Sequence, residues 1–252
     1  MRRREIIGTK VSITDYDEVL DAIDTAVAGN TPSYICCTPA SSLVFARDDI
    51  PLANALAAAD VVTPDGMGVV HAARLLGEKI ETRVYGPDLM DMQLARAAAA
   101  ATPTYLYGGH DDAALTALRE ALVARHPGLN IAGSYSPPHR ELTTDELSAA
   151  CDAINASGAR IVWVGLGSPK QEVWMHENRA VLEAPVLVGV GAAFDFFAGR
   201  VAQAPRWMQR ASLEWLYRMF QDPARLGKRY LLTLPRFAAL AFAQAFRERI
   251  LR

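Results

Sequence analysis

The sequence predicts an α/β fold: a doubly wound, mostly parallel sheet followed by a helical C-terminal appendage. Two observations predict the sheet. Short apolar runs alternate along the chain with amphipathic helical patterns, and most of these runs are apolar throughout, as parallel strands covered on both faces are. A change to a basic, aromatic-rich helical pattern after residue 199 predicts the appendage. Because strand and helix alternate regularly, we expect right-handed crossovers and a Rossmann-like arrangement.

The individual elements follow from the same two patterns. Apolar runs predict strands at residues 34–38, 60–63, 104–107, 129–133, 160–165 and 185–190. Helical periodicity predicts helices at residues 16–28, 52–59, 69–76, 87–99, 113–125, 144–156 and 170–181. We expect an α/β core at residues 1–199 and an appendage at residues 200–252, with ligands bound at the carboxyl ends of the strands.

Composition narrows the class of protein. With 252 residues, 51% of them hydrophobic, the chain can bury a sizeable core. Three cysteines do not make a disulfide framework and no Cys/His spacing resembles a zinc site, so we expect a reducing compartment and no metal. The first residues lack the long apolar region of a signal peptide, and no apolar run reaches the roughly 18–20 residues of a membrane span. These features predict a cytoplasmic protein.

Charge is unevenly distributed along the chain. The formal net charge is −2, which argues against a nucleic-acid partner. Residues 200–252 carry eleven Lys and Arg against three Asp and Glu, a net charge of +8, and residues 1–199 carry fifteen against twenty-five, a net charge of −10. Aromatic and leucine side chains recur in the tail at helical spacings, which predicts a basic amphipathic helix on an anionic membrane. The alternative is a helix that packs its apolar face on the core.

The first two strand ends carry candidate catalytic and binding residues. Thr38 ends the first predicted strand, and its hydroxyl either binds a ligand or caps the next helix. Asp65 follows the second strand beside Gly66 and Gly68, which permit close backbone approach. Its carboxylate is either a general base at a ligand-facing strand end or an N-cap.

Three later turns are rich in glycine. Gly108 and Gly109 follow the third strand and precede a helix with an acidic start, a weak anion-binding pattern. After the sixth strand, Phe194 and Asp195 either stack on and hydrogen-bond a nucleotide, or Phe194 packs in the core. The candidate nucleotide-binding residues of the three turns are Tyr107, Gly108, Gly109, Gly167, Ser168, Lys170, Gly191, Phe194 and Asp195.

The turn after the fifth strand is the most informative. Ser168 at the N-cap, Pro169 at the first helical position and Gln171 at the third form a predicted capping box. The box does not account for Gly167 or for Lys170, whose charge opposes the helix dipole in the first turn. A bound anion would offset that unfavourable interaction, so we expect this turn to contact a ligand.

Six stretches, in this order, carry a family resemblance that spans about residues 7–235. They are Thr63-Pro64-Asp65-Gly66-Met67-Gly68-Val69, Arg83 with Gly86 and Asp88-Leu89, Tyr107-Gly108-Gly109, Gly165-Leu166-Gly167-Ser168-Pro169-Lys170-Gln171-Glu172, Gly189-Val190-Gly191 with Phe194-Asp195-Phe196, and Ala204-Pro205-Arg206-Trp207-Met208-Gln209-Arg210 with Leu213-Glu214-Trp215-Leu216-Tyr217-Arg218. Together they resemble the WecG/TagA/CpsF glycosyltransferases (glycosyltransferase family 26), which make bacterial cell-surface polymers such as exopolysaccharides and teichoic acids.

The resemblance implies a metal-independent, inverting transfer of a sugar from a UDP-sugar to a polyprenyl-diphosphate-linked sugar, without a cofactor. Relatives transfer N-acetylmannosamine, its uronic acid or hexoses. In this family the aspartate of the PDG motif, here Asp65, is the general base. The substrate-binding residues that the resemblance implies are Thr38, Arg83, Gln171, Arg218, Arg225 and Lys228. One position departs from the pattern, because the family usually has Asn where this chain has Ala40.

The resemblance also implies that the tail binds the inner face of the cell membrane as a peripheral segment and closes the active site. We expect that removing the residues after about 200 leaves a folded, inactive core that no longer binds anionic liposomes. A displaced tail would leave an apolar surface on which a second copy can dock, so a homo-oligomer is a further candidate.

Two rival interpretations stay open. A nucleotide-dependent oxidoreductase would share the α/β core, but no GxGxxG with a downstream acid follows the first strand. A non-catalytic homologue that binds a sugar nucleotide or a lipid is the second rival, motivated by Ala40.

Overall fold

The computed structural model describes residues 1–250, and for Arg225 the backbone alone. A six-stranded parallel sheet has the order β4-β3-β8-β7-β5-β6, and a separate antiparallel hairpin pairs β1 with β2. All six predicted strands form, each within two residues of the predicted bounds. The Rossmann-like α/β class is therefore confirmed. The chain divides into two compact units.

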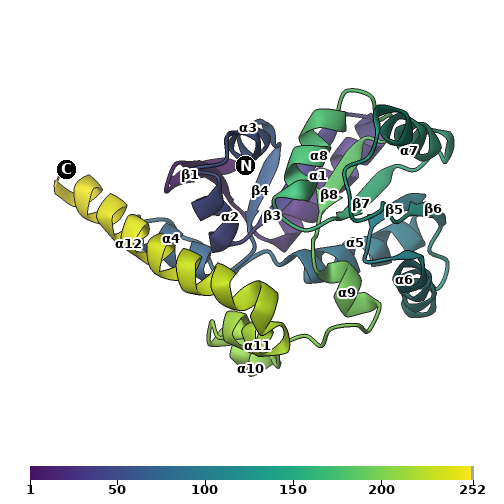
Figure 1. The fold of residues 1–252 in the computed structure, drawn as a ribbon. Coiled ribbons are helices and arrows are strands. Elements are labelled where there is room, and N and C mark those ends of the chain that lie inside the picture. The colour runs from purple at the N-terminus through teal and green to yellow at the C-terminus, as the bar shows by residue number, and fades with distance from the viewer. Residues whose placement is uncertain (251–252) are drawn as a thin grey trace. The chain divides into compact units, whose positions relative to one another are not determined.

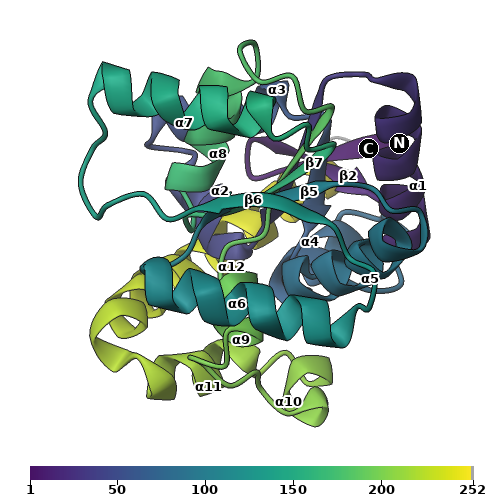
Figure 2. The same cartoon turned by 90° about the vertical axis from the view of Figure 1, so that its right-hand side faces the viewer.

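One unit, called here unit 2, comprises residues 16–36 and 86–201. Figure 2 shows α7 and α8 on one side of strands β5, β6 and β7, and α5 and α6 on the other side. The elements of unit 2 are α1 (Tyr16–Gly29), β3 (Ser33–Thr38, of which the first four residues belong to this unit), α5 (Gly86–Ala99), β5 (Thr104–Gly108), α6 (Asp112–Arg125), β6 (Ile131–Tyr135), α7 (Thr144–Ala156), β7 (Ile161–Gly165), α8 (Lys170–Asn178), β8 (Val186–Gly189) and α9 (Ala193–Phe197).

The central strands of unit 2 are buried because their sequences are apolar at nearly every position. Residues 161–164 of β7 are fully buried, and Trp163 is among the largest side chains in the interior. After β5 the chain continues to β6, at one edge of the sheet. After β7 it continues to β8, which lies on the side of β7 away from β5. The strand order therefore reverses between β5 and β7, and the carboxyl ends at such a reversal are the usual place for a ligand in an open α/β sheet.

The other unit, unit 1, comprises residues 1–15 and 37–85 together with the C-terminal segment from residue 202. Helix α12 runs along α2 and α4 (Figure 1). The elements of unit 1 are β1 (Arg2–Ile6), β2 (Thr9–Ile13), the last two residues of β3, α2 (Ala40–Phe45), α3 (Ile50–Ala58), β4 (Val61–Pro64), α4 (Met67–Leu75), α10 (Arg206–Arg210), α11 (Glu214–Gln221), the π-helical turn η1 (Pro223–Gly227) and α12 (Lys228–Ile250).

The β1–β2 hairpin is an element that the sequence analysis did not predict. Its two-residue turn places Ile7 and Gly8 at φ +45° and +97°, the left-handed region that a tight hairpin turn of this kind requires. Contacts to distant residues hold Ile7 there: its N–H donates to Gln244 Oε1 at 2.8 Å, and its carbonyl accepts from Arg47 Nη1 at 3.1 Å. Tertiary contacts, which local sequence does not show, therefore stabilise the turn.

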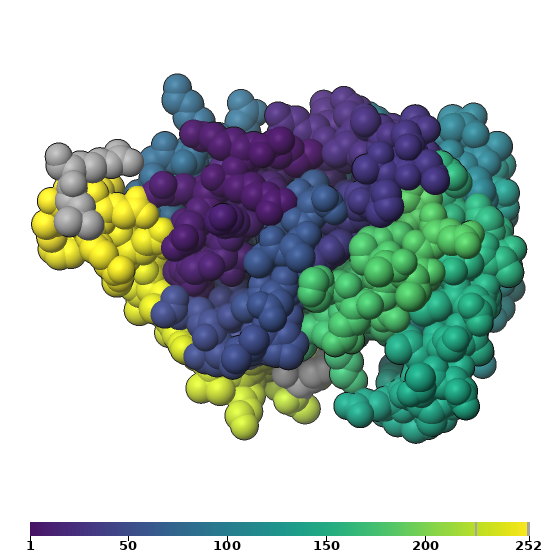
Figure 3. All heavy atoms as spheres, turned by 90° about the horizontal axis from the view of Figure 1, so that it is seen from above, coloured from purple at the N-terminus to yellow at the C-terminus, as the bar shows by residue number. Residues whose placement is uncertain are grey.

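Helix α12 has one buried and one exposed apolar face. Thr233, Phe237, Ala241 and Ala245 recur every four residues and are all buried. The end of the helix is fixed to the hairpin, because Arg4 forms an ion pair with Glu248 and Gln244 Nε2 donates to the carbonyl of Glu5. Figure 3 shows the purple hairpin next to the yellow end of α12.

Candidate active site

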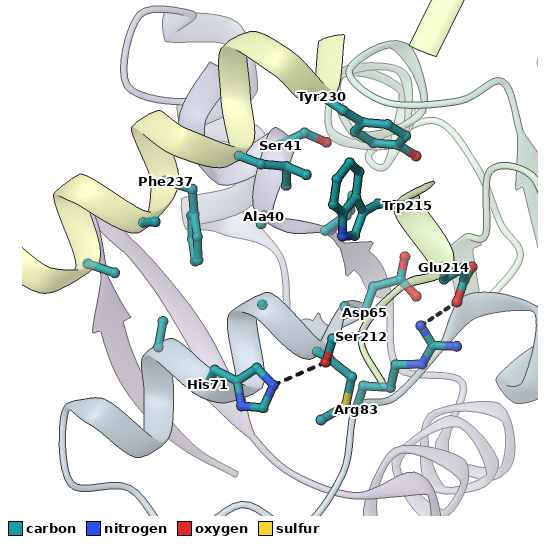
Figure 4. Close-up of a pocket in the computed structure, with 18 of the residues that line it drawn as sticks. Ala40, Ser41, Asp65, His71, Arg83, Ser212, Glu214, Trp215, Tyr230 and Phe237 are labelled. Carbon is teal, nitrogen blue, oxygen red and sulfur yellow. Dashed lines mark hydrogen bonds and ion pairs between the residues drawn. The ribbon is translucent and has the colours of Figure 1, made fainter. Parts of the chain in front are cut away.

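Unit 1 contains a cavity of about 530 Å³ at the carboxyl ends of β3 and β4. Such a volume is typical of small-molecule sites. Its walls come from the two strand ends, α4, α11 and α12 (Figure 4). Residues from the 37–85 segment and from the C-terminal segment meet there, among them Pro39, Ala40, Ser41, Asp65, Gly68, His71, Arg83, Tyr85, Gln209, Ser212, Glu214, Trp215, Arg218, Tyr230 and Phe237.

Asp65 is placed by the strand that precedes it. All four residues of β4 are buried, and the backbone N–H of Asp65 donates to the carbonyl of Thr38 at 3.3 Å. The N-cap of α4 is Gly66, with no side-chain cap. Asp65 is therefore not an N-cap, and its half-buried carboxylate points into the cavity (Figure 4). This geometry fits a general base better than a capping residue.

Arg83 is held by two partners from the C-terminal segment. Its Nη1 lies 2.6 Å from Glu214 Oε2, and its Nη2 donates to Gln209 Oε1 at 2.9 Å. Gln209 in turn donates from Nε2 to the carbonyl of Ala204 at 2.8 Å. The guanidinium carbon of Arg83 also lies 4.0 Å from the centre of the Tyr85 ring. Arg83 therefore joins the loop between α4 and α5 to α10 and α11.

Two guanidinium groups and two carboxyl groups meet at this end of the cavity. Burial lowers the pKa of Arg83, but the negative charges of Glu214 and Asp65 raise it by a larger amount, so the net change in this pKa is upward. Burial likewise lowers the pKa of Arg218, while Tyr230 and the same two carboxyl groups raise it, again with a net rise. Both arginines therefore remain cations and can stabilise negative charge on a substrate.

Polar contacts beside the cavity fix the C-terminal segment. Arg229 donates to Ser41 Oγ at 3.0 Å from Nη2 and at 3.2 Å from Nε. His71 Nε2 and Ser212 Oγ lie 3.1 Å apart, and Ser212 adopts φ +62°. These contacts connect α2 and α4 to the segment that follows residue 202.

The six predicted substrate-binding residues do not share one location. Arg83 and Arg218 line the cavity together with Asp65. Thr38 is fully buried and precedes Pro39, the first residue of the chain that lines the cavity. Lys228 is exposed at the start of α12. The side chain of Arg225 lies outside the described part of the chain. The sixth residue, Gln171, belongs to unit 2.

In unit 2, the first two glycine turns approach each other closely at the β5–β7 reversal. Gly108 and Gly109 adopt φ +122° and +100°, and the N–H of Gly109 donates to the carbonyl of Gly165 at 3.2 Å. A Cβ on Gly108 would lie 2.6 Å from the carbonyl carbon of Gly165. Only glycine fits at Gly108. At the carboxyl ends of β5 and β7 the two turns therefore expose backbone groups and not side chains.

The capping box predicted at Ser168 is wrong. Helix α8 begins at Lys170, and its N-cap is Pro169, which makes no side-chain cap hydrogen bond. The N–H of Gln171 instead donates to the carbonyl of Gly167 at 3.0 Å, so backbone satisfies the donor that the box was meant to cap. The side chain of Gln171 is buried, and its Oε1 has no hydrogen-bond partner among the described residues. A buried, unsatisfied amide oxygen is free to accept a bond from a ligand.

The other predicted nucleotide-binding residues of unit 2 differ in exposure. Tyr107 is buried and stacks on Trp174 at 4.1 Å between ring centres. Phe194 is also buried, and its ring occupies the space beside Gly165, where a Cβ would lie 2.5 Å from Phe194 Cδ2. This position matches the core-packing alternative for Phe194. Lys170 is exposed. Asp195 is half-buried, and its Oδ1 lies 3.5 Å from Arg200 Nε.

Sequence reasoning missed most of the cavity's lining as site residues, and the polar residues that it missed include Gln209, Glu214, His71 and Ser212. Glu214 had a signal, because it is one of only three acidic residues in the basic segment after residue 199. Gln209 and Glu214 also fall within the last of the six matching stretches. For His71 and Ser212 we find no such signal in the sequence.

Residues 1–250 contain no group of three or more His, Cys, Asp and Glu side chains placed to hold a metal ion. None of the helices in this range is both long and apolar enough to cross a bilayer.

The fold and the cavity define a Rossmann-like α/β protein with an acid and two arginines in a pocket at the strand ends, a class that includes many transferases. The sequence profile of the Glycosyl transferase WecG/TagA/CpsF family matches residues 4–250, nearly the whole chain. The chain belongs to this family. It is therefore a glycosyltransferase of cell-surface polysaccharide synthesis.

Proposed function

We propose that this glycosyltransferase transfers a sugar with inversion from a UDP-sugar to a polyprenyl-diphosphate-linked sugar. The sugar is of the N-acetylmannosamine type, its uronic acid or a hexose, and the product enters exopolysaccharide or teichoic acid synthesis. The observation that carries the proposal is the placement of Asp65 in one cavity with Arg83 and Arg218. A base beside two cations suits an acceptor that bears both a hydroxyl group and a diphosphate.

In the proposed step, Asp65 takes the proton from the acceptor hydroxyl as that oxygen attacks the anomeric carbon of the donor. The new carbon–oxygen bond forms as the bond from the anomeric carbon to the UDP oxygen breaks, and UDP leaves with the electron pair. Attack on the side opposite the leaving group inverts the anomeric centre. A positioned base of this kind contributes about 10²–10⁴-fold to the rate.

The departing diphosphate needs positive charge or N–H donors. The turns of unit 2 supply candidates in Gly108, Gly109 and Gly167 and in Lys170, whose exposed ammonium lies in the first turn of α8. Backbone N–H groups and a helix N-terminus favour a phosphate. We assign the nucleotide to these turns and propose that transfer proceeds without a metal ion or a cofactor.

The exposed face of α12 supports peripheral attachment to the inner face of the cell membrane. Leu231, Phe242, Phe246 and Ile250 are each about two-thirds exposed and recur at helical spacing. Cations interrupt this apolar row, as on helices that lie in an anionic interface. The opposite face of α12 packs inside unit 1. The two alternatives for the tail, a helix on the membrane and a helix packed on the protein, therefore apply to different faces of α12.

The direct test is a panel of UDP-sugars incubated with the purified chain and a synthetic prenyl-diphosphate-linked sugar. We expect transfer of one sugar, and we expect NMR to show that the product has the opposite anomeric configuration to the donor. A chelator should leave the rate of transfer unchanged. UDP-sugar binding without any product from the whole panel would instead favour the non-catalytic alternative, which Ala40 in the cavity wall motivates. Stabilisation by a nicotinamide cofactor and not by UDP would favour an oxidoreductase.

A further inference from the structure

The cavity of unit 1 has two chemically different halves. Charged groups gather at the end that holds Asp65 and Arg218. The other half lies between α4 and α12, where the polar side chains of His71 and Ser212 are joined by a hydrogen bond. The apolar half is lined by Gly68, Ala72, Leu75, Phe237, Ala238 and Phe242.

Small residues on facing helices form the trough of the apolar half. A Cβ on Gly68 would lie 3.7 Å from Ala40 Cβ and 3.9 Å from Phe237 Cε1, which is ordinary contact. The ring of Phe237 is buried and Ala72 is 4% exposed, so the floor is fixed by packing. A trough lined mainly by apolar side chains, where His71 bonds to Ser212, fits a hydrocarbon chain better than a sugar.

The trough opens onto the exposed row of α12. Phe242 lines the cavity and is nevertheless 63% exposed, and it lies four residues before Phe246 in the same row. A molecule with its anionic group beside Arg218 and its chain in the trough would therefore leave the cavity at the face that we propose lies on the membrane. An amphiphile anchored in a bilayer has this form.

We propose that the apolar half binds the isoprene units next to the diphosphate of the lipid-linked acceptor. This inference rests on the proposed function, which supplies the acceptor class, and it adds a chain-binding subsite between α4 and α12. Burial of each CH₂ strengthens binding roughly fourfold. The protein is therefore expected to prefer a diphosphate with a longer chain until the trough is filled.

Ala238 allows a variant that fills the trough without disturbing the core. It lines the cavity from the exposed side of α12, so Ala238→Phe adds bulk to the trough from solvent. Ala243 is an exposed alanine of the same helix that does not line the cavity, and Ala243→Phe is the matched control. Both variants gain the same side chain on the same helix.

The test compares binding of dimethylallyl diphosphate and farnesyl diphosphate to the full chain by calorimetry. We expect the wild type and Ala243→Phe to bind the farnesyl compound at least about tenfold more tightly, and Ala238→Phe to lose this preference. Equal affinities in the wild type, or an unchanged preference in Ala238→Phe, would overturn the subsite. Sugar transfer is measured separately with the UDP-sugar panel, so chain preference without transfer would count against the proposed function and not against the subsite.

Discussion

Arg83 Nη1 lies 2.6 Å from Glu214 Oε2, and each of these side chains is only 11% exposed. The pair links the 37–85 segment to α11, which follows more than a hundred residues later in the chain. Removing one partner of a buried ion pair leaves an uncompensated charge in a poorly solvated place. The stability of unit 1 therefore depends on this contact as well as on the packing of α12.

We predict that Glu214→Ala lowers the free energy of unfolding by about 3 kcal/mol or more. Urea denaturation followed by tryptophan fluorescence measures the change. The double variant Arg83→Met with Glu214→Leu removes both charges. We expect it to lose less stability than the sum of the losses in the single variants Arg83→Met and Glu214→Leu. Additive losses would mean that the two groups do not stabilise one another.

We predict that Asp65→Asn folds normally and loses about 10²–10⁴-fold in kcat for sugar transfer. The carboxylate is half-buried and does not cap α4, so an amide of the same shape leaves the local structure intact. Steady-state kinetics give kcat, and circular dichroism checks the fold. Asp60→Asn, the same change at an exposed position before β4, is the control with ordinary turnover. Near-wild-type kcat in Asp65→Asn would reject the base assignment.

The strands could be predicted because their signal is local. A continuous apolar run between turn residues identifies a buried parallel strand, and all six such runs form strands. The β1–β2 hairpin could not be predicted in this way, because Ile7 in a left-handed conformation contradicts its own preference. Contacts from Gln244 and Arg47, far along the chain, stabilise that conformation.

From local pattern alone, the candidate site could be predicted only at a strand end. Asp65 follows an apolar run and lines the cavity, whereas Arg83 and Arg218, which also line it, were expected from the family resemblance. Glu214 and Gln209 enter the cavity from helices of the C-terminal segment, and their contact with Arg83 is a tertiary contact that spacing along the chain does not reveal. The misplaced capping box at Ser168 has a similar cause, because backbone hydrogen bonding competes with side-chain capping in a glycine-rich turn.

We predict that Phe246→Ser reduces sedimentation with liposomes that contain an anionic phospholipid and leaves the fold unchanged. Phe246 is 69% exposed on α12, so its removal costs little packing but deletes a large apolar group from the proposed membrane face. Val123→Ser in α6, an exposed apolar residue of unit 2, is the control and should sediment like the wild type. Equal sedimentation of Phe246→Ser would exclude this face of α12.

The turn after β5 is expected to tolerate no side chain at Gly108. We predict that Gly108→Ala lowers the free energy of unfolding by about 3 kcal/mol, because its methyl group would meet the backbone of Gly165 at 2.6 Å in a conformation that favours glycine. Gly167→Ala, at φ +76° with open space around the added carbon, should cost only about 1 kcal/mol. Urea denaturation of both variants measures the difference, and equal losses would contradict the close approach of the two turns.

The open space at Gly167 also allows a test of the nucleotide assignment. If the phosphates of UDP contact the backbone of this turn, a methyl group at Gly167 obstructs them, although beyond the adjacent residues no other heavy atom of the protein lies within 4 Å of the added carbon. We therefore predict that Gly167→Ala weakens UDP binding about tenfold, a loss of 1.4 kcal/mol by calorimetry. Gly158→Ala is the matched control, since Gly158 also has a left-handed φ, +67°, and open space but lies between α7 and the amino end of β7, and not at a carboxyl end. If both variants bind UDP like the wild type, the phosphates lie elsewhere; if both bind it weakly, the left-handed substitution itself is responsible.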